Sequence, residues 1–131
     1  PGIVVGPVHL LRWEVPDVPH RIVPDDQVEG ELARLHDALV RARARLDLVR
    51  ARAAAHAGPE EAAIFDVQLT ILEDVELLAE VEALVRQNLG AEKAVDLAML
   101  EWRRRFERSP HAMLRERVQD LVDVQIRVLS V

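Results

Sequence analysis

The chain has 131 residues, half of them hydrophobic, and a formal net charge of −6. It contains no cysteine, which excludes disulfides, thiolate nucleophiles and thiolate metal sites. The acidic balance argues against nucleic acid and anionic membranes as partners and favours a basic protein partner, and no apolar run approaches the ~18 residues of a membrane span.

Residues 1–24 have the pattern of an extended segment followed by a connector. Ile3, Val4 and Val5 are strand formers. Because a single strand has no ladder of its own, we expect this one to pair with a partner outside the chain. Three prolines in residues 13–24 predict an extended, semi-rigid linker.

Residues 25–58 have the pattern of one long helix. Apolar residues recur at alternating spacings of four and three, which makes a heptad seam. The seam residues are Val28, Leu32, Leu35, Leu39, Ala42, Leu46, Val49 and Ala53. Asp25 suits the helix start and Gly58 its end. Because more helices follow closely, we expect the seam to pack against helices of the same domain.

Shorter helices are predicted after this one. Asp74 is typical of an N-cap and predicts a break in the second helix. The run 88–90, Asn-Leu-Gly, ends the third helix, and Ser109-Pro110 is expected to cap the last helix. The predicted fold class is all-α: a helical bundle of two packed hairpins with one long first helix over residues 25–131, preceded by an isolated N-terminal strand segment.

The stretch 62–81 has more apolar residues than one amphipathic stripe needs. Its apolar side chains spread over about 200° of the helix surface, whereas packing on one face takes a little over 100°. Aspartates and glutamates surround the run. Apolar anchors with a charged rim are typical of protein interfaces, so this stretch is the candidate binding surface.

Catalytic motifs are absent from this sequence. None of the five histidines lies in a Glu-x-x-His pair or a His-Glu-x-x-His motif, and no glycine-rich phosphate loop occurs. The hydroxyl nucleophiles are two serines and one threonine, and Ser109 is better explained as a helix cap. The residues alone therefore indicate a binding or interaction domain.

Three sequence motifs occur in an order that is typical of one family. They are "PGIVVGPVHLL" at the start, "AIFDVQLTILEDVEL" in the candidate binding surface and "LRERVQDLVDV" near the end. They resemble the first strand, the second-helix signature and the late signature of the N-terminal part of enzyme I. Enzyme I is the phosphoenolpyruvate–protein phosphotransferase of the sugar phosphotransferase system.

The resemblance implies a fragment of a larger enzyme. In the family, a helical subdomain inserted in an α/β phosphohistidine domain docks the small phosphocarrier HPr, whose own histidine receives the phosphoryl group. The family's active histidine follows a Gly-Gly-x-Thr-Ser-His run that this chain lacks, so no catalytic residue is assigned here. Residues 1–24 would be the first strand of the α/β domain with its linker, and residues 25–131 the docking domain.

The resemblance also implies features of the full-length protein. It implies Mg²⁺ for the full-length enzyme but no cofactor or metal in this fragment, and a homodimer formed through a C-terminal domain that is not in this chain. It further implies a cytoplasmic protein with neither nucleic acid nor membrane as partner.

The resemblance places carrier docking on the candidate surface and on the last helices. Ile64, Ile71 and Leu77 would be exposed anchors, and acidic residues would steer a basic carrier. The candidate docking residues are Glu60, Glu61, Ile64, Gln68, Ile71, Asp74, Glu76, Leu77, Phe106, Leu114 and Arg117. Gln68 departs from the family, which usually has histidine there. A nitrogen-regulatory or multidomain relative with a carrier paralogue is therefore an alternative.

A second hypothesis is a self-associating helical scaffold, in which the heptad seam mediates dimers without any phosphotransfer. The scaffold predicts a dimer, whereas the docking module predicts a monomer that binds a basic carrier.

We predict that this chain accepts no phosphoryl group from phosphoenolpyruvate, because it lacks both the family's substrate-binding barrel and its histidine motif. Incubation with labelled phosphoenolpyruvate, Mg²⁺ and carrier should leave the intact mass of the chain unchanged. A stoichiometric, acid-labile gain of one phosphate, for example on His111, would contradict the docking-module hypothesis.

Overall fold

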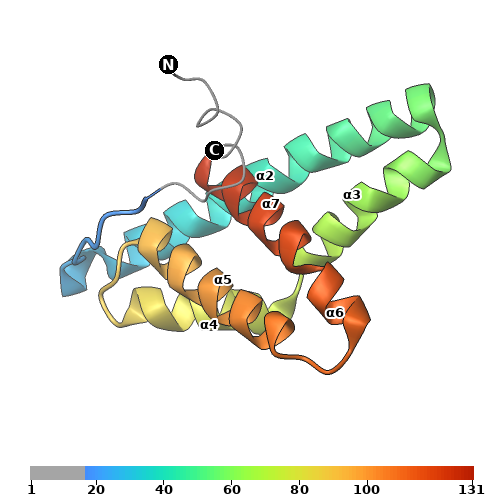
Figure 1. Ribbon diagram of the computed structural model, residues 1–131. Helices are drawn as coiled ribbons and strands as arrows, with labels where there is room; N and C mark the ends of the chain where they lie inside the picture. The colour runs from blue at the N-terminus through green and yellow to red at the C-terminus, as the bar shows by residue number, and fades with distance from the viewer. Residues whose placement is uncertain (1–16) are drawn as a thin grey trace, which may run out of the picture.

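The computed structural model describes residues 17–131, and the predicted strand in residues 1–12 lies outside them. Helices follow one another along this part of the chain (Figure 1). They are η1 (Asp25–Gln27), α2 (Val28–Ala57), α3 (Pro59–Leu72), α4 (Val75–Arg86), α5 (Ala91–Glu107), α6 (Ala112–Glu116) and α7 (Val118–Leu129). No strand is assigned within residues 17–131, apart from one isolated bridge. The predicted all-helical fold class is confirmed, and none of the described helices is long and apolar enough to span a membrane.

The helices pack as two antiparallel pairs, one of which contains α2. Figure 1 shows α2 and α3 as an antiparallel pair, and α4 below α5 as another. α7 contacts α5 and α3, and so joins the two pairs. The long helix α2 contacts α3, α4, α5 and α7.

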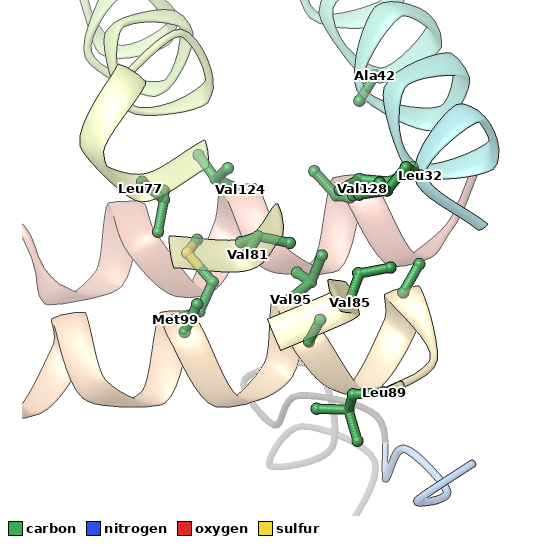
Figure 2. Close-up of a cluster of buried hydrophobic side chains, with 14 of the residues drawn as sticks. Leu32, Ala42, Leu77, Val81, Val85, Leu89, Val95, Met99, Val124 and Val128 are labelled. Carbon is green, nitrogen blue, oxygen red and sulfur yellow. The ribbon is translucent and has the colours of Figure 1, made fainter. Parts of the chain in front are cut away.

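The heptad seam of α2 faces the inside of the chain. Leu32, Leu35, Ala42 and Leu46 are buried, and three of these four belong to a hydrophobic cluster that α4, α5 and α7 complete. Figure 2 shows Leu32 and Ala42 of α2 with Val81 of α4, Val95 of α5 and Val128 of α7. The prediction that the seam packs against helices of the same domain is confirmed.

The turn between α2 and α3 depends on glycine. Gly58 has φ +95°, in the region that L-residues rarely adopt. Its N–H donates to the carbonyl oxygen of Ala53 at 3.1 Å, and Pro59 is the first residue of α3. The predicted helix stop at Gly58 is confirmed.

The last helix departs from the prediction. It divides into α6 and α7 at Arg117. Ser109 Oγ accepts from the N–H of His111 at 3.1 Å, but α6 begins at Ala112 without a side-chain cap. The expectation of one last helix capped by Ser109 is wrong. A physical reason is that α6 has no buried residue, so no packing holds it in line with α7.

The end of the linker packs on the bundle. Val23 is buried, and its N–H donates to the carbonyl oxygen of Asn88 at 2.7 Å. The N–H of Gly90 donates to the carbonyl oxygen of Arg21 at 2.9 Å. Asn88 has φ +71°, a conformation that asparagine tolerates better than most residues, and its Nδ2 donates to the carbonyl oxygen of Val23 at 2.8 Å.

A cluster of four charged residues connects this linker to α2 and α5. Glu31 is only 8% exposed. Its Oε2 accepts from Arg21 at 2.5 Å, from Arg34 at 3.0 Å and from the backbone N–H of Ala91 at 2.7 Å. Arg34 and Arg21 also donate to Glu92. Arg21 and Arg34 thus bridge the carboxylates of Glu31 on α2 and Glu92 in the first turn of α5.

The cluster lowers the pKa of both carboxyl groups. Burial would raise the pKa of Glu31, but the Ala91 hydrogen bond and the two arginines outweigh it and leave that pKa below its usual value. The hydrogen bond from Arg34 lowers the pKa of Glu92 to about 2, against the opposing effect of burial. Both groups therefore stabilise the fold when ionised, and this contribution is lost as pH falls below about 4.5.

We predict that Glu31→Gln lowers the free energy of unfolding at pH 7 by about 1–3 kcal/mol, because it removes a charge that two arginines share. Glu29→Gln is the matched control, because Glu29 pairs with Arg86 at 3.3 Å on the surface. This substitution should lower the free energy of unfolding by less than about 1 kcal/mol. Urea denaturation at pH 7 and pH 3 measures both. The Glu31 effect should shrink at pH 3, and an equal effect of the two variants would contradict this account.

Candidate docking surface

The first turns of α3 carry carboxylates and an exposed isoleucine. Pro59 occupies the first helical position, where its missing N–H costs no hydrogen bond. Glu60 and Glu61 follow and are exposed, at the helix end that favours negative charge. Ile64 is 49% exposed. The predicted apolar anchor thus lies one turn beyond the acidic residues.

Further along α3, the apolar stripe enters the core. Gln68 is only 3% exposed and Leu69 is buried. Ile71 and Leu72 are half-buried and pack against the core cluster. Ile71 is therefore not the exposed anchor that was expected, because it packs against the core, whereas Ile64 remains exposed.

Gln68 joins α3 to α7. Its Oε1 accepts a hydrogen bond from Arg127 Nε at 2.9 Å. The guanidinium carbon of Arg127 lies 5.8 Å from the centre of the Phe65 ring. The side chain of Gln68 is almost fully covered, so it bridges α3 and α7 and does not face solvent.

The corner between α3 and α4 is capped by Asp74. One carboxylate oxygen of Asp74 accepts from the N–H groups of Glu76 at 2.9 Å and Leu77 at 3.0 Å. The predicted N-cap and helix break are confirmed. Glu76 is exposed, and Val75 is 77% exposed. Leu77 was expected to be an exposed anchor, but it is 7% exposed and belongs to the core; that expectation is wrong, because the cap turns Leu77 inward.

The short helix α6 presents apolar side chains to solvent. Met113 is 68% exposed and Leu114 is 37% exposed. Arg117 follows α6, and its Nη1 lies 3.4 Å from Asp120 Oδ2. Phe106, at the end of α5, is half-buried, with its ring centre 6.1 Å from that of Trp102.

These residues, all exposed except the half-buried Asp74, lie on three segments, and we name them together the docking surface. It comprises Glu60, Glu61 and Ile64 on α3, Asp74, Val75 and Glu76 at the corner, and Met113, Leu114 and Arg117 on and after α6. Both α3 and α6 contact α7. Of the other expected docking residues, Phe106 and Ile71 are half-buried and Gln68 is buried.

Sequence reasoning missed Val75 and Met113. Val75 directly follows the N-cap Asp74 and lies two positions before the buried Leu77. Residues two apart on a helix face different directions, so this spacing could have indicated that Val75 points outward. For Met113 the sequence holds no such signal, because the separation of α6 from α7 leaves it exposed.

The docking surface combines charged and apolar side chains. Its members are carboxylates, apolar side chains and one arginine. In the part of the chain that the structure describes, no three His, Asp or Glu side chains are grouped so as to hold a metal ion.

The family described as PEP-utilising enzyme, N-terminal matches residues 1–117. The chain is 36% identical to a phosphoenolpyruvate-protein phosphotransferase of Cupriavidus necator and 32% identical to one of Priestia megaterium, in each case over 130 residues. Each alignment covers 98% of this chain and 22% of the relative. The chain therefore spans about a fifth of the length of these relatives.

Two solved structures resemble the fold. An NMR structure of an enzyme I protein, nEIt, has a TM-score of 0.81 at 26% identity, over 89% of this chain and 48% of that one. A structure named as the N-terminal domain of Enzyme 1 - Nitrogen has a TM-score of 0.78 at 31% identity, over 86% of this chain and 47% of that one.

Proposed function

The chain belongs to the family of PEP-utilising enzyme N-terminal regions, and we propose that its bundle is the module on which a larger phosphoenolpyruvate–protein phosphotransferase docks an HPr-type phosphocarrier. The observation that carries this proposal is the docking surface itself: exposed apolar side chains on three segments with carboxylates between them. The names of the relatives indicate phosphoryl transfer from phosphoenolpyruvate to a protein, and the docking surface is where we expect the partner to bind.

The apolar anchors would provide most of the binding energy. Ile64, Val75 and Met113 are each about half exposed or more. Covering such a side chain contributes on the order of 1 kcal/mol, and apolar contacts surrounded by a polar rim usually dominate an interface.

The carboxylates would steer the partner. Glu60, Glu61, Asp74 and Glu76 stand beside the anchors, in a chain with a net charge of −6. The resemblance to enzyme I implies a carrier with a basic docking face. Rim charges of opposite sign mainly raise the association rate.

In this proposal the chain positions the reactants and does no chemistry of its own. The phosphoryl group would pass from a histidine outside this chain to the carrier's histidine, with one N–P bond broken and another formed. Docking raises the effective concentration of the two groups. Among the described residues, no group of His, Asp or Glu side chains could hold Mg²⁺. The resemblance to enzyme I implies that Mg²⁺, phosphoenolpyruvate binding and homodimer contacts belong to other parts of the full-length protein.

A nitrogen-branch carrier is a second candidate partner. It is supported by the 31% identity to the domain named for Enzyme 1 - Nitrogen and by Gln68. Gln68 stands where the family usually has histidine.

The self-associating scaffold is less well supported. This hypothesis requires that a second chain pack against the heptad seam of α2. Helices of the same chain already bury the seam residues Leu32, Leu35, Ala42 and Leu46.

We predict that Ile64→Ala weakens binding of an HPr-type carrier about five- to tenfold, mainly through faster dissociation, because it removes about 1 kcal/mol of apolar contact. Leu48→Ala is the matched control, since Leu48 is 52% exposed on α2. Surface plasmon resonance measures both rates.

Removal of acidic charge from the docking surface should change the rate of carrier association more than the rate of dissociation. Glu60→Gln, Glu61→Gln and Glu76→Gln together should lower the association rate and its salt dependence. Asp74→Asn tests the fourth carboxylate, since asparagine also caps helices. An association rate that does not change with salt between about 50 and 300 mM would contradict the role of the carboxylates.

Equal effects of Leu48→Ala and Ile64→Ala on carrier binding would contradict the role of Ile64 as an anchor.

A further inference from the structure

A hollow of about 380 Å³ lies between α2 and α7, apart from the docking surface. It is lined by Ala42, Arg45, Asp123, Ile126, Arg127 and Ser130. We propose that this hollow binds a small oxyanion, the phosphate or carboxylate group of a free metabolite, between the guanidinium groups of Arg45 and Arg127.

Arg127 is held in place by two contacts with α3. Its Nε donates to Oε1 of the buried Gln68 at 2.9 Å, and its guanidinium carbon lies 5.8 Å from the Phe65 ring centre. These contacts use Nε and one face of the guanidinium group, and leave the two terminal nitrogens for a ligand. An arginine that is already ordered loses less entropy when it binds an anion.

Arg45 is the second cation and differs from its neighbours on α2. Arg41 pairs with Asp37, Arg43 with Glu73, and Arg50 with Asp66. Among the salt bridges within residues 17–131, none involves Arg45 or Arg127. In this part of the chain, two guanidinium groups without a carboxylate partner therefore line the same hollow.

The other polar groups of the hollow are engaged elsewhere. Asp123 Oδ1 accepts from Gln119 Nε2 at 3.0 Å, and Ser130 Oγ donates to the carbonyl oxygen of Ile126 at 2.7 Å. Asp123 would repel an anion, but two arginines outnumber this one carboxylate.

The size and charge of the hollow favour a small molecule. Its volume lies at the lower end of the range of small-molecule sites, and arginine forms charge-assisted, often bidentate, hydrogen bonds to phosphate and carboxylate. For two such contacts we expect a dissociation constant of about 1–10 mM.

The test is an NMR titration of the ¹⁵N-labelled chain with inorganic phosphate, glycerol 3-phosphate or acetate, against sodium chloride at equal ionic strength. We expect saturable shifts of the amides of Ala42, Arg45 and Ile126 and of Arg127 Nε, with phosphate or acetate. Saturation by phosphate and glycerol 3-phosphate but not by acetate would identify a site for phosphate groups, and saturation by acetate as well would identify a general oxyanion site. Shifts that do not saturate with any of the three anions would overturn the proposal.

Variants make the test specific. Arg45→Gln, at an exposed position, should keep the fold and weaken binding at least fivefold. Asp123→Asn should strengthen it, because a like charge is removed. Arg52→Gln is the control: Arg52 lies on the same helix but does not line the hollow. Equal effects of Arg45→Gln and Arg52→Gln would show a general ionic effect and overturn the proposal.

Discussion

The structure depends on the burial of one side of α2. This helix has 30 residues, which makes it about 45 Å long, and no helix of its length could leave such a seam in water. α3, α4, α5 and α7 each cover part of it. The positions of those four helices are therefore consequences of one apolar seam, and the charged cluster around Glu31 fixes the linker and the start of α5 to the same helix.

The docking surface arises where that packing ends. The stripe of α3 is covered at Gln68 and Leu69, and Ile64 is left exposed one turn earlier. The same holds at the corner, where the Asp74 cap turns Leu77 into the core and Val75 out of it. Exposed apolar residues thus stand at the edge of a core that is otherwise closed, which is the arrangement expected of a module whose partner is another protein.

Local signals in the sequence predicted the helices well. The heptad seam, the Gly58 stop and the Asp74 cap each depend on near neighbours, and the structure confirms them. Exposure was harder to predict, because it depends on which helix lies opposite. Leu77 and Ile64 both belong to the apolar run of residues 62–81, yet only tertiary packing decides that Leu77 is buried and Ile64 is not. The division of the last helix at Arg117 also had no local signal, since residues 112–129 contain neither glycine nor proline.

The central claim is that a phosphocarrier covers the docking surface. The most direct test is a methyl NMR titration of the chain with an HPr-type carrier. The account predicts that the methyl signals of Ile64, Val75 and Met113 shift, while those of Val40 and Leu48, which are similarly exposed on α2, do not. Shifts confined to Val40 and Leu48, or no shifts at carrier concentrations in the millimolar range, would contradict it.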